Sequence, residues 1–117
     1  MSAYLDTQPE LPTAFFADND IIAFSCMRAL KEHGYRIPED VSIVGFDDMP
    51  FCTIMSPALT TMSVSKEALG RAAIYLLDRR MNEKPAYHVK FELSTELRRF
   101  SKNAASLFMI TNLIWCL

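Results

Sequence analysis

The chain has 117 residues, a length that fits one domain at most. Half of the residues are hydrophobic, so the composition is that of a globular chain and excludes a disordered one. Twelve basic and 14 acidic residues give a formal net charge of −2, which leaves no basic excess to neutralise phosphates. We therefore expect no binding of nucleic acid by this chain alone.

The first half of the chain reads as a strand, a helix and a second strand. Apolar residues 14–17 predict a short buried strand, and a helix is expected from about Ile21 to His33, with Asp20 as its N-cap and Gly34 as the residue that ends it. Residues 41–46 are nearly all apolar and predict a strand covered on both faces. This order indicates parallel strands joined by a right-handed crossover. We therefore expect an α/β fold in which parallel strands alternate with helices.

The second half continues the alternation and then changes character. A strand is expected at about residues 60–64, and Ser65 is expected to cap a helix at about residues 66–81. Residues 87–93 alternate between apolar and polar side chains, which predicts a strand with one solvent-facing side. Residues 104–117 carry no charge and are too few for a membrane-spanning helix, which needs about 20. A buried helix or strand and a non-native extension both stay open for this segment.

Polar residues follow each of the first two predicted strands, as Asp18-Asn19-Asp20 and as Asp47-Asp48. Ligands of open α/β sheets bind beyond the carboxyl ends of the strands, so these side chains should lie together. An Asn amide both donates and accepts hydrogen bonds and an ionised Asp only accepts, which suits a ligand rich in hydroxyls or amines. Each residue has a structural alternative: a helix cap for Asp20, a left-handed conformation for Asn19 and a turn for the last two aspartates.

Motifs of catalysis and metal binding are absent from the sequence. It contains no Gly-x-Ser-x-Gly, no Walker loop and no His-Glu-x-x-His, so we expect no enzymatic activity, no catalytic residue and no cofactor. The three cysteines form no C-x-x-C pair, which argues against a zinc site and fits a reducing cytoplasm. The carboxylates at the two strand ends could hold Mg²⁺ as in a receiver domain, although no Lys follows the next strand to complete such a site.

Four segments together resemble the lactose-repressor-type (LacI/GalR) family of transcriptional regulators. Residues 12–20 are similar to the family's P-T-A-…-N-D segment, and residues 29–48 to its R-A-L-x-x-x-G-x-x-[IV]-P-x-D-[IV]-S-[IV]-[IV]-G-[FY]-D-[DN] segment. Residues 57–61 resemble its P-x-L-T-T, and residues 65–80 its following helix with L-G-x-x-A. The resemblance extends over about residues 4–100. It implies a partial periplasmic-binding-protein-like fold of two lobes, with a small-molecule effector in the cleft.

The resemblance also implies roles for individual residues. Asn19 and Asp47 would hydrogen-bond the effector, which in this family is a sugar or, less often, a nucleobase. Family members form dimers through the helix after N-D and through the segment after G-F-D-D. The homodimer interface implied here contains Phe24, Met27, Arg28, Phe51 and Met55.

The family resemblance divides the chain between two lobes. Residues 1–62 would belong to the carboxyl-terminal, effector-binding lobe, and residues 63–100 to the crossover and part of the amino-terminal lobe. Residues 101–117 form an apolar tail without a counterpart. The helix-turn-helix, the hinge helix and most of the amino-terminal lobe have no counterpart either, so we expect both lobes to be incomplete.

These features predict an effector-sensing and dimerising fragment of a cytoplasmic transcriptional regulator, without the DNA-binding domain. Two alternatives stay open. One is a sugar-binding module of the transport type, against which the lack of a signal peptide at the amino terminus argues. The other is the receiver-like α/β domain that uses aspartates with Mg²⁺.

Overall fold

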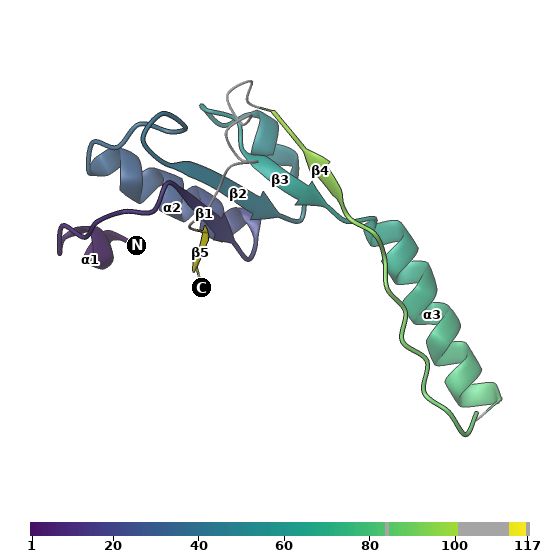
Figure 1. Ribbon diagram of the computed structural model, residues 1–117. Helices are drawn as coiled ribbons and strands as arrows, with labels where there is room; N and C mark the ends of the chain where they lie inside the picture. The colour runs from purple at the N-terminus through teal and green to yellow at the C-terminus, as the bar shows by residue number, and fades with distance from the viewer. Residues whose placement is uncertain (84, 101–112, 117) are drawn as a thin grey trace. The chain divides into compact units, whose positions relative to one another are not determined.

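The computed structural model of the protein describes residues 1–83, 85–100 and 113–116 (Figure 1). The chain forms two compact units, Met1–Ser63 with Leu97–Leu117 and Val64–Glu96. The assignment of these two units to two lobes of a larger domain stays a prediction. The elements of the first unit are α1 (Ser2–Leu5), β1 (Ala14–Ala17), α2 (Asp20–Glu32), β2 (Ser42–Phe46), the 3-10 helix η1 (Pro50–Thr53), β3 (Thr60–Ser63) and β5 (Leu113–Cys116).

The sheet has the strand order β4-β3-β2-β1-β5, in which β4 is Glu96–Arg98. β1 and β2 are parallel, with Ala14 opposite Ser42 and Phe16 opposite Val44. β2 and β3 are also parallel, and Gly45 lies opposite Thr61. The predicted α/β fold with parallel strands is therefore confirmed. α2 follows β1 and leads into β2, so the expected strand-helix-strand unit is present (Figure 1).

The bounds of α2 follow from its two ends. Asn19 has an extended backbone, and its side-chain Oδ1 accepts a hydrogen bond from the backbone N–H of Ile22 at 2.9 Å. At the other end, Gly34 has φ +84°, a left-handed conformation that glycine adopts without strain. The N–H groups of Gly34 and Tyr35 donate to Lys31 O and Leu30 O, each at 3.0 Å, which is a Schellman motif. Gly34 thus ends the helix as predicted, whereas the N-cap is Asn19 and not Asp20.

The core of the first unit lies between α2 and the sheet, and α1 packs against α2. The spacing of apolar residues along α2 places one face of the helix on the strands. β1 and β2 contribute side chains that are covered almost completely, as expected for parallel strands. The buried cluster comprises Leu5, Phe15, Ala17, Ala23, Cys26, Met27, Ala29, Leu30, Val41, Ile43, Cys52 and Leu59.

The second unit is dominated by α3 (Lys66–Asn82). Ser65 caps it as predicted, because its hydroxyl accepts from the N–H of Ala68 at 3.2 Å. The apolar side chains of α3 are largely open to solvent: Leu69 and Leu77 are exposed, and Ala72 is the one residue of α3 that is buried.

The strand predicted at residues 87–93 is wrong, since those residues form no regular element. Alternating side chains indicate a half-buried strand only where a neighbouring strand takes up the backbone hydrogen bonds. Among the described residues, no strand pairs with residues 87–93, and the short strand β4 begins three residues later at Glu96. Of the uncharged segment 104–117, the part that is described, Leu113–Cys116, is a strand; residues 104–112 and 117 lie outside the described residues.

Candidate functional site

The two predicted effector contacts follow neighbouring parallel strands. Asn19 comes two residues after the end of β1, and Asp47 comes directly after β2. The β1–β2 register pairs Phe16 with Val44, so the two parallel strands end at the same edge of the sheet. Both residues are half-buried at the carboxyl edge of the sheet. This is the edge at which open α/β sheets bind ligands.

The side-chain oxygen of Asn19 accepts a hydrogen bond within the fold, whereas the side-chain nitrogen does not take part in it. Its Oδ1 caps α2 through Ile22, so this oxygen is not available to a ligand without loss of the cap. Its Nδ2 has no hydrogen-bond partner among the described residues. The two N–H groups on that nitrogen can therefore donate to an acceptor such as a hydroxyl oxygen. The left-handed conformation considered for Asn19 is wrong, because its φ is −153°.

The segment after β2 is held by three successive backbone N–H groups. The N–H of Asp47 donates to Met62 O at 2.9 Å, and the N–H of Asp48 donates to Thr61 Oγ1 at 3.4 Å. The N–H of Met49 donates to Asp20 Oδ2 at 2.7 Å. Asp47 and Asp48 have φ of 104° and 52°, values that non-glycine residues adopt rarely and that Asp tolerates better than most. The turn is thus fixed by hydrogen bonds to β3 and α2 rather than by local preference.

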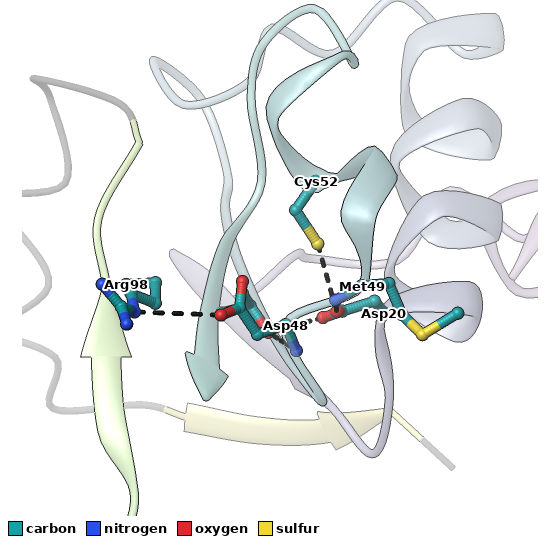
Figure 2. A network of polar contacts seen from close by, with 6 residues as sticks. Asp20, Asp48, Met49, Cys52 and Arg98 are labelled. Carbon is teal, nitrogen blue, oxygen red and sulfur yellow. Dashed lines mark hydrogen bonds and ion pairs between the residues drawn. The ribbon is translucent and has the colours of Figure 1, made fainter. Parts of the chain in front are cut away.

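Asp20 is the centre of this arrangement (Figure 2). Its side chain is fully buried. Oδ2 accepts from the N–H of Met49 and from the thiol of Cys52 at 3.1 Å, and Oδ1 accepts from the Thr61 hydroxyl at 2.6 Å. The interpretation of Asp20 as a simple helix cap is therefore wrong, because the residue joins the start of α2 to β3, to the turn after β2 and to η1.

The cysteine in this network is held in its thiol form. Burial and, after it, the hydrogen bond to the Asp20 carboxylate together raise the pKa of Cys52 to about 12. A thiol with so high a pKa is a poor nucleophile at neutral pH, because the thiolate is the reactive species. Cys52 therefore acts here as a hydrogen-bond donor, and its role is structural.

Asp48 faces another strand of the sheet. Its carboxylate Oδ2 lies 3.8 Å from Nε of Arg98 in β4, and both side chains are partly exposed (Figure 2). An ion pair of this kind contributes about 0–1 kcal/mol. No pattern in the sequence pointed to Arg98, since it follows the strand that was expected at residues 87–93.

Of the five residues expected at a dimer interface, four are at least partly exposed and one is buried. Phe24 of α2 and Phe51 of η1 pack together, with ring centroids 5.0 Å apart, so the two predicted segments are neighbours. Arg28 and Met55 are exposed. Met27 is 2% exposed and belongs to the core, so it offers no surface to a partner, and its place in the predicted interface is corrected.

Neither a cluster of metal ligands nor a membrane-spanning helix is found in the described part of the chain. Residues 1–83, 85–100 and 113–116 contain no group of three or more His, Cys, Asp or Glu side chains that could hold a metal ion. Both oxygens of Asp20 accept hydrogen bonds within the protein, which removes one carboxylate from the receiver-like alternative. No helix within these ranges is long and apolar enough to cross a bilayer.

The parallel sheet with its polar carboxyl edge defines the class as an α/β ligand-binding domain. The model of the periplasmic binding protein-like domain family matches residues 2–99. The chain therefore belongs to this family, and within it corresponds to a fragment of the effector domain of a LacI-type regulator.

Known relatives are regulators that are much longer than this chain. The HTH-type transcriptional repressor PurR of Pasteurella multocida is 43% identical over 90 residues, which are 77% of this chain and 27% of that protein. A LacI family regulator from Arthrobacter sp. FB24, solved in complex with lactose, is 32% identical with a TM-score of 0.69 over 84% of this chain and 37% of its own. A LacI family regulator from Enterococcus faecium, solved with ribose, is 33% identical with a TM-score of 0.68 over 84% and 36%.

Proposed function

We propose that this chain is an effector-sensing and dimerising fragment of a cytoplasmic transcriptional regulator, and that it contacts a sugar through Asn19 and Asp47. The observation that carries the proposal is the placement of both residues at the carboxyl edge of adjacent parallel strands. Two of the similar structures hold sugars, lactose in one and ribose in the other. A sugar presents hydroxyl groups that both donate and accept hydrogen bonds, which the amide of Asn19 and the carboxylate of Asp47 complement.

The regulatory mechanism that follows is differential binding. An effector that contacts one arrangement of the parent protein better than another shifts the population toward that arrangement. The chain spans 27% of the PurR relative, so this coupling to DNA would be a property of the parent regulator. The part described here would supply the contacts from β1 and β2. With its formal net charge of −2, this chain is not expected to bind duplex DNA by itself.

Asn19→Asp separates the two functions of the Asn19 side chain. Aspartate is as good a helix cap as asparagine, so Ile22 keeps its acceptor and the fold should be unchanged. The variant loses both N–H donors, and we expect its affinity for lactose or ribose to fall by about tenfold, the equivalent of one hydrogen bond of about 1.4 kcal/mol. Titration followed by NMR shifts of the Asp47 and Asp48 amides measures this affinity.

Asn19→Ala and Asn82→Ala serve as comparisons. The first removes the cap and the donors together, so it should lose both affinity and about 1 kcal/mol of helix stability. The second removes an exposed amide that bonds Asp78 in α3, and it should leave sugar binding as it is. Equal affinity of Asn19→Asp and the unmodified chain for every sugar that binds would count against Asn19 as an effector contact.

Dimerisation is proposed on the surface formed by α2 and η1. Ile54, directly after η1, is 80% exposed, Met55 is exposed beside it, and the paired rings of Phe24 and Phe51 lie between the two segments. Singly exposed apolar residues are common, whereas a group of them indicates an interaction site. A second copy of the chain is the partner that the dimer-forming segments of the family imply.

Ile54→Asp is expected to shift the chain from dimer to monomer in sedimentation velocity experiments. A charge in the centre of an apolar interface loses its hydration without gaining a partner, and we expect the dimer dissociation constant to rise at least about tenfold. Ile74→Asp in α3 is the matched control, because Ile74 is 71% exposed and lies in the other unit. Loss of dimer in both variants, or in neither, would contradict this location of the interface.

A further inference from the structure

β1 has the composition of a strand that needs a neighbour on both sides. Ala14, Phe15 and Ala17 are buried, and the strand contains no charged residue. Strands at the edge of a sheet usually carry charges, prolines or bulges, because an open edge pairs readily with other chains. β2 occupies one edge of β1. The opposite edge, if it were open, would be a template for strand addition.

The carboxyl-terminal strand β5 lies along that opposite edge (Figure 1). It runs parallel to β1, and its register pairs every residue of β1, from Ala14 with Leu113 to Ala17 with Cys116. The four residues of β5, Leu113–Cys116, carry no charge. Such a composition is typical of a strand that is paired within a parallel sheet.

We propose that the outer edge of β1 is a strand-accepting surface and that Leu113–Cys116 of the same chain is the segment that occupies it. Backbone hydrogen bonds supply most of the affinity in strand addition, so β5 can pair with β1 without a particular side-chain sequence. Four paired residues are a short strand, but the covalent connection makes the pairing intramolecular and raises its effective concentration. β5 thereby covers the edge of β1 and prevents it from pairing with other chains.

Backbone nuclear Overhauser effects in the unmodified chain test the pairing directly. The register places Phe15 opposite Ile114, so we expect cross-peaks between the backbone protons of these two segments, beside those between Phe15 and Ile43. A mixture of isotope-labelled and unlabelled chains separates contacts within one chain from contacts between two. Absence of the Phe15–Ile114 peaks while the β1–β2 peaks are present overturns the proposal. Peaks found only between chains overturn it as well, because they assign the edge to a second copy.

A pair of substitutions at position 114 tests the consequence for β1. Ile114→Pro removes a backbone N–H and disfavours the paired conformation, whereas Ile114→Val keeps both the N–H and the preference for strands. We expect hydrogen exchange of the β1 amides to become at least about tenfold faster in Ile114→Pro, with β2 and β3 unchanged, and to stay as it is in Ile114→Val. Unchanged exchange of β1 in Ile114→Pro contradicts the proposal. The Overhauser result holds for the unmodified chain whatever the stability of the proline variant.

Discussion

Asp20→Ala is expected to lower the free energy of unfolding by about 3 kcal/mol, the upper range for a single substitution. The reason is the number of groups that depend on one buried carboxylate. Its removal leaves the N–H of Met49, the thiol of Cys52 and the hydroxyl of Thr61 without their acceptor. A buried polar group that loses its partner costs about 1–3 kcal/mol, and the three costs are not additive. Urea denaturation followed by circular dichroism measures the change.

Asp20→Asn refines this prediction. Its amide oxygen can accept from the Met49 N–H, and its amide nitrogen can donate to Thr61 Oγ1. If the Thr61 hydroxyl becomes an acceptor instead of a donor, most of the network is preserved. We expect a loss of about 1 kcal/mol, clearly smaller than for alanine. Asp18→Ala is the control two residues earlier, since Asp18 is exposed, and it should stay within about 0.5 kcal/mol of the unmodified chain. An Asp20→Ala variant as stable as Asp18→Ala would show that the carboxylate does not hold these elements together.

The elements that sequence predicts well are those whose signals are local. Gly34 ends α2 because the Schellman motif requires a left-handed residue, and Ser65 begins α3 because its hydroxyl reaches an N–H three residues on. The apolar runs at residues 14–17 and 41–46 become β1 and β2 because buried parallel strands need such side chains on both faces. None of these signals depends on a distant part of the chain.

The candidate site was predictable in its location but not in its internal roles. Three polar residues follow β1, and any of them can cap a helix, so local preference favoured Asp20 where the protein uses Asn19. The role of Asp20 is decided by its hydrogen-bond partners Met49, Cys52 and Thr61, which lie 29 to 41 residues further along the chain. The strand expected at residues 87–93 failed for a similar reason: its alternation is real, but no neighbouring strand in the described residues pairs with it.

One signal for the buried carboxylate was present in the sequence. Gly45 interrupts the largely apolar strand β2, and a glycine inside a strand often marks the close approach of another group. That group is Asp20. Gly45 and Thr61 are opposite each other in the β2–β3 register, and the carboxylate of Asp20 bonds Thr61 while it fills the space left by the missing side chain of Gly45.

Gly45→Ala is therefore expected to destabilise the first unit by about 3 kcal/mol. A Cβ atom at this position would lie under 3.0 Å from Oδ1 of Asp20 and 3.1 Å from Cδ2 of Leu59. Overpacking of a rigid site costs about 1–3 kcal/mol, and Asp20 is a short side chain fixed by three hydrogen bonds, so it cannot move away without breaking them. Gly70→Ala in α3 is the matched control, because nothing lies within 4 Å of its Cβ position, and it should stabilise the helix by about 0.5–1 kcal/mol.

A double-mutant cycle connects the two positions. If the carboxylate of Asp20 is what an alanine at position 45 strikes, then Gly45→Ala should cost less in the Asp20→Ala background, by at least about 1 kcal/mol, since the remaining contact with Leu59 is the milder of the two. Equal cost in both backgrounds would mean that the strain arises elsewhere in β2. The sign of this coupling is what distinguishes a glycine that makes room for a buried carboxylate from one that merely weakens a strand. Two residues 25 positions apart in the sequence, one a supposed helix cap and the other a gap in a strand, would then be parts of a single packing arrangement.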